Sequence, residues 1–164
     1  MIITIDGVAG AGKSTLARFL HDEFQSKCSV FIVHMDFLYD GWKNPFSPAL
    51  SEKLTAIVQA HIHSLPSSIS FYDWQNSAPG PISTIPAVQT LIIEGVGSGQ
   101  RAIREFVDTK IWIDLETMMG LRRVLQRDGG EIEDQMLIFL EEQRRHFVEE
   151  GTRDAADFHL NGLY

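Results

Sequence analysis

Residues 7–14 read GVAGAGKS, and this stretch decides the fold. It matches the pattern G-x-x-x-x-G-K-[ST], in which a glycine-rich loop points backbone N–H groups at phosphate oxygens. The loop stands between a short apolar run, residues 2–6, and a segment with helical periodicity, residues 13–24. These flanks predict a buried strand and a helix whose positive N-terminal end faces the phosphates. The sequence therefore predicts a phosphate-binding loop between a strand and a helix.

The loop predicts ATP and Mg²⁺ as ligands. Lys13 would reach the β- and γ-phosphates, and the Ser14 hydroxyl would ligate Mg²⁺. The alternative is a glycine-rich turn that binds nothing. The residues expected around the nucleotide are Gly7, Ala9, Gly10, Ala11, Gly12, Lys13, Ser14 and Thr15.

Short apolar runs alternate with amphipathic segments along the rest of the chain. Further strands are expected at 29–34, 90–93, 110–115 and 158–160, and further helices at 51–64, 101–107, 117–127 and 132–150. This order predicts one domain, residues 1–164, with a three-layer α/β/α P-loop NTPase fold and about five parallel strands. Residues 69–74 read as a short edge strand, and the proline-rich residues 77–86 read as a loop or lobe.

The charge and the hydrophobic runs of the sequence limit the kinds of partner that the chain is expected to bind. The 164 residues carry a net charge of −8, which argues against a broad nucleic-acid surface, since such a surface usually needs a basic face. No apolar run is long enough to span a membrane, and the N-terminus lacks the features of a signal peptide. The expectation is a cytoplasmic monomer or homodimer whose partner is a small-molecule acceptor.

Two acidic residues directly follow predicted strands, Asp36 after 29–34 and Glu94 after 90–93. The carboxyl ends of parallel strands share one edge, so both side chains should lie beside the phosphates. Asp36 would accept a proton from an attacking hydroxyl, and both carboxylates would help Ser14 hold Mg²⁺. The alternatives are a helix cap or turn former at Asp36 and a solvated strand end at Glu94.

Six short segments stand in a characteristic order along the chain, namely the loop at 7–14, MDFLY at 35–39, YDW at 72–74, LIIEG at 91–95, LRRVLQRD at 121–128 and AD at 156–157. In these segments the chain resembles the uridine kinase and phosphoribulokinase group of P-loop kinases, most closely the bacterial uridine kinase-like proteins. The resemblance implies that Asp36 is the base and a metal partner, that Glu94 helps hold Mg²⁺, and that Tyr39, Tyr72 and Trp74 line the acceptor site. The three aromatic residues could equally be packing residues.

Kinases of this group carry arginines on the helix that enters a mobile lid. Arg123 and Arg127 stand four residues apart before a predicted lid at 128–134, and the resemblance implies that they stabilise the transferred phosphoryl group. The lid departs from that of uridine kinases because it is short, acidic and without arginines. Five other arginines are candidates to replace the missing cations, namely Arg101, Arg104, Arg144, Arg145 and Arg153.

The predicted function is an ATP- and Mg²⁺-dependent transfer of the γ-phosphate to a hydroxyl of a small molecule, with a nucleoside as one candidate. The predicted catalytic residues are Lys13, Asp36, Arg123 and Arg127. A nucleoside monophosphate kinase, another small-metabolite kinase and a non-catalytic ATP sensor are the alternatives. A GTPase would need an N-K-x-D type segment, which the sequence lacks.

Overall fold

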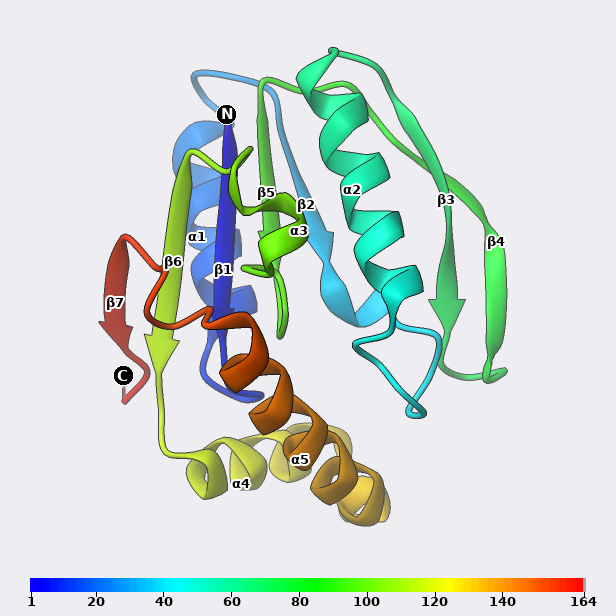
Figure 1. Cartoon of the computed structure of the whole chain (residues 1–164), viewed down its shortest axis with the longest axis vertical. Helices are drawn as coiled ribbons and strands as arrows, with labels where there is room; N and C mark the ends of the chain where they lie inside the picture. The colour runs from blue at the N-terminus through cyan, green and yellow to red at the C-terminus, as the bar shows by residue number, and fades with distance from the viewer. Residues whose placement is uncertain (164) are drawn as a thin grey trace.

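The computed structural model describes residues 1–163 and contains a five-stranded parallel sheet (Figure 1). The strand order is β2-β5-β1-β6-β7, so the chain starts in the middle of the sheet and builds outward on both sides. All strands end at the same edge, which is the lower edge in Figure 1. The strands are β1 (Ile2–Gly7), β2 (Val30–His34), β5 (Thr90–Glu94), β6 (Thr109–Asp114) and β7 (Phe158–Asn161).

The central strands β1 and β5 are buried along their whole length. Successive side chains of β5 enter different cores, because Leu91 and Ile93 belong to one cluster and Ile92 to the other. A strand covered on both faces needs apolar residues at every position, which explains the continuous apolar runs of the sequence.

Helices cover both faces of the sheet, and this confirms the predicted three-layer P-loop fold. The buried Ala17 of α1, with Leu16 and Leu20 beside it, packs into the cluster that holds Ile92, whereas Leu54 of α2 and Ile103 of α3 pack into the other cluster. The α-helices are α1 (Lys13–Phe24), α2 (Pro48–Ile62), α3 (Arg101–Arg104), α4 (Thr117–Asp128) and α5 (Glu133–Glu150). Two 3₁₀ turns, η1 (Met35–Phe37) and η2 (Gly130–Ile132), follow β2 and α4.

The prediction of a loop at 77–86 was wrong. This segment contains β4 (Ala78–Ile85), which pairs antiparallel with β3 (Ser67–Asp73) in a separate two-stranded sheet. Proline is tolerated in β4 because one edge of each strand in a two-stranded sheet has no ladder partner to satisfy. The predicted strand at 69–74 therefore exists, but as part of this hairpin. The predicted helix at 101–107 is shorter and ends at Arg104.

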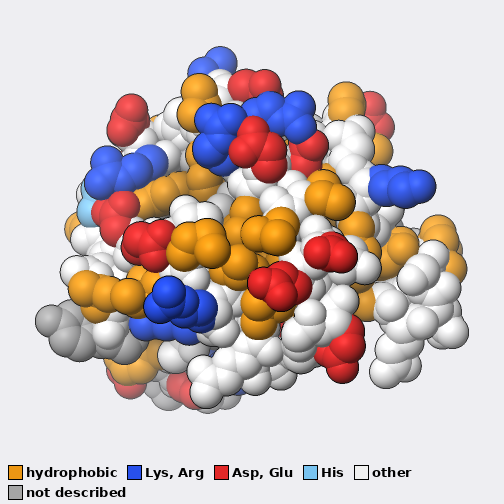
Figure 2. Space-filling view, turned by 90° about the horizontal axis from the view of Figure 1, so that it is seen from below, with side chains coloured by type: hydrophobic (Ala, Val, Ile, Leu, Met, Phe, Trp, Pro, Cys, Tyr) orange, Lys and Arg blue, Asp and Glu red, His pale blue; other side chains and the backbone are white. Residues whose placement is uncertain are grey.

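No helix within residues 1–163 is long and apolar enough to cross a bilayer. Figure 2 looks at the molecule from below the strand ends and shows hydrophobic side chains interspersed with acidic and basic ones. The exposed hydrophobic residues of α4 and α5 include Met118, Leu137 and Ile138.

Candidate active site

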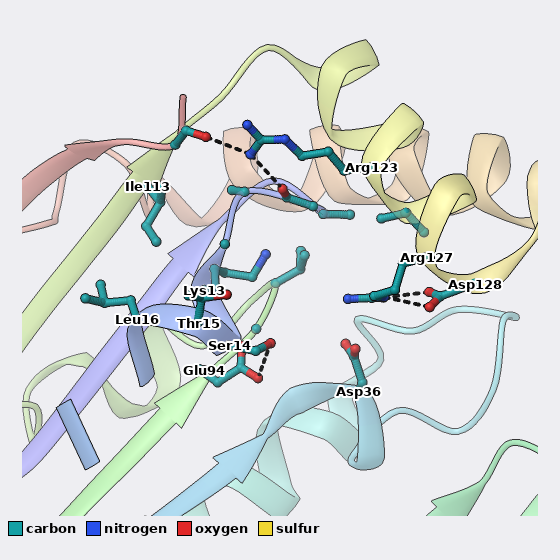
Figure 3. A pocket seen from close by; sticks show the side chains of 18 of the residues that line it. Lys13, Ser14, Thr15, Leu16, Asp36, Glu94, Ile113, Arg123, Arg127 and Asp128 are labelled. Atoms are coloured by element: carbon teal, nitrogen blue, oxygen red, sulfur yellow. Dashed lines mark hydrogen bonds and ion pairs between the residues drawn. The ribbon is translucent and has the colours of Figure 1, made fainter. Parts of the chain in front are cut away.

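A cavity of about 940 Å³ opens at the edge of the sheet where the strands end. It lies between the loop after β1, the start of α1, the ends of β2 and β5, and helices α4 and α5 (Figure 3). Gly7 and Tyr72 are the two predicted site residues that do not line it. The structure brings the others together around the cavity, namely Ala9, Gly10, Ala11, Gly12, Lys13, Ser14, Thr15, Asp36, Tyr39, Trp74, Glu94, Arg123 and Arg127.

Lys13 is folded into the phosphate-binding loop. Its ammonium group donates to the carbonyl oxygens of Gly7 and Val8, each at 2.8 Å. Burial lowers the pKa of Lys13, although the nearby carboxylates of Asp6 and Glu94 oppose this shift. Gly12, just before α1, has a φ of +97°, a conformation that glycine adopts without strain. The loop therefore curls around one buried cation at the N-terminus of α1.

Two buried side chains, Gln143 and Asp6, hold the phosphate-binding loop through hydrogen bonds to its backbone. Gln143 of α5 accepts a hydrogen bond from the backbone N–H of Ala9 at 2.8 Å, so this N–H is already engaged. Asp6, at the end of β1, accepts from the N–H groups of Gly7, Gly97 and Gly99 at 2.7 to 3.0 Å. Asp6 therefore ties the start of the phosphate-binding loop to the loop that follows Glu94.

Gly120 is the point where α4 packs against the phosphate-binding loop. A Cβ atom at Gly120 would overlap the carbonyl oxygen of Ala9, and one at Gly10 would overlap the backbone of Gly120. We expect Gly120→Ala to lower the free energy of unfolding by about 1–3 kcal/mol, because the backbone must shift to admit the methyl group. Urea unfolding measures this loss. Gly130→Ala is the matched control, since a Cβ there meets no atom within 4 Å, and an equal loss in both variants would contradict the prediction.

Ser14 and Glu94 meet at the floor of the cavity. The Ser14 hydroxyl donates to Glu94 Oε1 at 2.9 Å, and His34 Nδ1 contacts the same oxygen at 2.5 Å. The hydrogen bond to Glu94 raises the pKa of His34. Glu94 is buried, with 4% of its surface exposed. The pair provides two hard oxygen donors, the type that Mg²⁺ prefers.

Asp36 and Arg127 approach the cavity from different walls (Figure 3). Asp36 lies on η1 and is exposed within the cavity. Desolvation raises the pKa of Asp36, and the charge of Glu94 adds to this, while Lys13 and Arg127 oppose it. Arg127 donates from Nε and a terminal nitrogen to Asp128, both at 2.6 Å. The cavity thus holds a carboxylate with raised proton affinity, and the guanidinium of Arg127 points toward it from the opposite wall.

Arg123 holds backbone segments together. One of its terminal nitrogens donates to the carbonyl oxygens of Gly10 at 3.3 Å and Gly162 at 2.7 Å. It thereby links the phosphate-binding loop to the turn after β7, and Figure 3 shows both contacts. Of the two predicted arginines, Arg127 is the one whose side chain points toward Asp36.

The five arginines considered as substitutes for lid cations lie elsewhere. None lines the cavity. Arg104 donates to the carbonyl oxygens of Gly99 and Glu150, and Arg153 pairs with Asp114. Arg101 also contacts Glu150, and Arg144 and Arg145 pair with Glu141 and Glu142 on their own helix. Arg18 of α1, which sequence reasoning did not single out, is the additional arginine that does line the cavity.

The predicted aromatic residues take different positions. Tyr39 is 2% exposed, and its hydroxyl donates to the carbonyl of Val96 at 2.7 Å; burial raises its pKa well above the usual value. Trp74 lines the cavity and donates from Nε1 to the carbonyl oxygen of Asp36 at 2.9 Å. Tyr72 lies behind it, with its ring centroid 4.9 Å from that of Trp74. Tyr72 therefore supports the wall without forming it.

Besides Arg18, sequence reasoning missed four further residues that line the cavity or hold the loop. Trp42 and Phe139 line the cavity beside Trp74, whereas Asp6 and Gln143 hold the loop. Trp42 stands in a segment that reads only as a loop, and Phe139 and Gln143 lie in a helix whose apolar residues read as plain core. Of these residues, only Asp6 could have been recognised from the sequence. It stands directly before the loop, and a charged residue at the end of a buried strand needs a partner.

Asp6 makes stability depend on pH. Burial raises its pKa from 3.8 to about 6, against the effect of three backbone N–H groups and of Lys13. The folded state thus binds the Asp6 proton more tightly than the unfolded state, so this contribution is full below pH 3.8 and is lost as pH rises through about 6. Asp6→Asn removes it. The contribution of Asp6 is the free energy of unfolding of the wild type minus that of Asp6→Asn. We expect this difference to fall by about 2 kcal/mol between about pH 4.5 and about pH 7.5.

Urea unfolding at both pH values measures this difference. Asp154→Asn is the control, because Asp154 is exposed. A pH-independent difference between the wild type and Asp6→Asn would show that the proton is not bound more tightly in the folded state.

The cavity and the sheet beneath it resemble those of P-loop small-molecule kinases. The proteins of similar sequence include uridine kinases. The chain is 24% identical over 176 residues to the uridine kinase of Geobacillus kaustophilus (strain HTA426), covering 94% of this chain and 83% of that one. It is 25% identical to the uridine kinase of Clostridium botulinum (strain 657 / Type Ba4), covering 94% of this chain and 85% of that one.

A solved structure of similar fold is described as a possible uridine kinase from Bacillus stearothermophilus. The TM-score is 0.71 at 20% identity, with 98% of this chain and 88% of that chain covered. This likeness supports the fold. No family model matches the chain. The resemblance to uridine kinase-like P-loop kinases that the sequence motifs indicated is thus confirmed.

Proposed function

We propose that the chain transfers the γ-phosphate of ATP, with Mg²⁺, to a hydroxyl group of a small molecule. One observation carries the proposal: the phosphate-binding loop, Asp36 and Arg127 border the same cavity. A phosphate site, a proton acceptor and a cation for the transferred group are the three parts that phosphoryl transfer to a hydroxyl requires. The named relatives, which are uridine kinases, agree with this reaction class.

The residues present fit both ligands. Backbone N–H groups of the loop and the N-terminus of α1 suit the phosphates, and Lys13 stands beside them. The Ser14 hydroxyl and the Glu94 carboxylate suit Mg²⁺, with Asp36 available through water. When bound, Mg²⁺ would neutralise charge on the phosphate oxygens.

The chain's own residues would then act as follows. The acceptor hydroxyl oxygen attacks the γ-phosphorus while its proton passes to the carboxylate of Asp36. The bond between the γ-phosphorus and the β–γ bridging oxygen breaks, and ADP leaves with the electron pair. Arg127 and Lys13 stabilise the negative charge of the transferred group. Arg123 keeps the loop and the turn after β7 in place through its contacts with Gly10 and Gly162.

Two observations favour an enzyme over an ATP sensor. Asp36 is open to the cavity and makes no hydrogen bond through its carboxylate to any residue within 1–163, so no structural contact accounts for it. Its raised pKa also suits a proton acceptor, because a base works best when its proton affinity is near that required at the working pH. A sensor needs neither property.

The test is ADP release by the pure protein with ATP and Mg²⁺, against pools of alcohols, nucleosides and phosphorylated metabolites. One pool is expected to raise release well above the background rate, and Asp36→Asn is expected to abolish that rise. Tight ATP binding with no stimulation by any pool would favour the sensor instead.

A further inference from the structure

The wall of the cavity next to Asp36 is aromatic and apolar. It begins at Trp74, whose Nε1 bonds to the backbone of Asp36. The ring of Trp42 lies 5.0 Å from that of Trp74 and 6.3 Å from that of Phe139, centroid to centroid. Phe37, Ile132 and Met136 also line the cavity. Trp42 thus joins residues from the hairpin and from α5 into one surface.

The hydrogen-bonding groups of this wall are almost all used internally. The Tyr39 hydroxyl donates to Val96 and the Trp74 indole to Asp36. Within this wall and the adjoining Asp36, the Asp36 carboxylate and the Trp42 indole N–H make no side-chain hydrogen bond to residues 1–163. An acceptor with many hydroxyls would leave several of them without partners when it displaces water here, and such unpaired polar groups are costly.

No residue of this aromatic wall is cationic, and the four cations among residues 1–163 that line the cavity come from other parts of it. Lys13 is held by the phosphate-binding loop, Arg123 by backbone carbonyls and Arg127 by Asp128. Arg18 lies on α1, one turn beyond Ser14. Asp36 adjoins the aromatic wall through its hydrogen bond with Trp74 and carries a carboxylate, so a carboxylate or second phosphate held against this wall would be repelled.

We propose that the acceptor is an uncharged alcohol with a flat, largely apolar ring, here termed a ring alcohol, and that Trp42 determines this specificity. The inference rests on the proposed phosphotransferase function and names its substrate class. The ring packs against Trp42 and Trp74, and the single reacting hydroxyl reaches Asp36. A nucleoside, whose ribose carries three hydroxyls, is then a poorer acceptor than a ring alcohol.

Steady-state kinetics with six probes test the substrate class. The ring alcohols are 3-pyridinemethanol and 2-phenylethanol, and the contrasting probes are uridine, uridine 5′-monophosphate, shikimate and D-glycerate. We expect kcat/KM for the better ring alcohol to exceed that for each contrasting probe by at least about tenfold, because each unpaired buried hydroxyl or charge disfavours binding. A higher kcat/KM for uridine or for any anionic probe overturns the inference and leaves the phosphotransferase function standing.

Three variants test the role of Trp42. We expect Trp42→Ala to raise KM for the ring alcohol at least about tenfold with KM for ATP unchanged, and Trp42→Phe to restore most of the affinity. Phe158→Ala is the matched control, because Phe158 is an exposed aromatic residue of β7 outside the cavity. Equal increases in KM for ATP and for the ring alcohol would show a general disturbance and overturn the assignment.

Saturation-transfer NMR with 3-pyridinemethanol separates a failure of recognition from a failure of catalysis. In one outcome the wild type binds 3-pyridinemethanol, Trp42→Ala abolishes this binding, and no probe is turned over. This outcome supports the recognition surface and contradicts the phosphotransferase function. Absence of binding, together with ADP release stimulated by another acceptor class, contradicts the ring-alcohol inference alone.

Discussion

Lys13→Ala is expected to lower kcat/KM for ATP by at least about a hundredfold, the loss typical when one preorganised donor to the reacting group is removed. The Lys13 ammonium is buried in the loop and donates to two carbonyl oxygens within it. No other cation lies inside the loop among residues 1–163, so water would have to replace the charge facing the phosphates. Both ATP affinity and turnover should fall, because the same group contacts the ground state and the transition state.

Calorimetric titration with ATP and single-turnover kinetics separate the two effects. Lys27→Ala is the matched control, because Lys27 is exposed beyond the end of α1. Circular dichroism must show that Lys13→Ala is folded, since its loss leaves the carbonyls of Gly7 and Val8 without their partner. If the folded variant bound and turned over ATP like the wild type, this would contradict the role of Lys13 in the phosphate-binding loop.

Asp36→Asn is expected to lower kcat by about 10²–10⁴-fold while the dissociation constant of ATP changes by less than about threefold. Asparagine keeps the size of the side chain but cannot accept the proton of the acceptor hydroxyl. The carboxylate lies at the end of β2 and makes no side-chain hydrogen bond within residues 1–163, so the substitution removes chemistry and little structure. The effect should therefore appear in kcat and not in nucleotide affinity.

Asp40→Asn is the control, because Asp40 is exposed, pairs with Lys53 and does not line the cavity. The pH profile of the wild type adds a second readout. Since desolvation raises the pKa of Asp36, kcat should decline as pH falls at values above the ordinary range of an aspartate. Unchanged turnover by Asp36→Asn would remove Asp36 from the role of base.

The sequence was informative where a short segment carries its own structural cause. The glycine at position 12, followed by Lys13 and Ser14, encodes a loop at the start of a helix, and the structure contains it. The run at 90–93 is apolar at every position, which predicts a strand covered on both faces, and β5 is such a strand. Asp36 and Glu94 reach the same cavity because strand ends in a parallel sheet share one edge.

The sequence was uninformative or misleading where a residue's role depends on a distant neighbour. The segment 77–86 reads as a loop from its prolines, yet it pairs with β3, and no local pattern reveals the partner strand. Arg123 and Arg127 read alike, but Arg123 is occupied by Gly10 and Gly162, residues 113 and 39 positions away in the chain. Their different contacts separate a residue that holds the loop from one that points toward Asp36.

The sequence by itself thus determined the phosphate-binding loop, the parallel sheet and the two carboxylates at its edge, because periodicity and a contiguous motif encode them locally. Only the tertiary structure decided which arginines face the cavity, that Gln143 and Asp6 hold the loop, and that Trp42 meets Trp74 and Phe139 in one wall. These contacts join elements far apart in the chain, and they form only when the sheet and its covering helices are packed together.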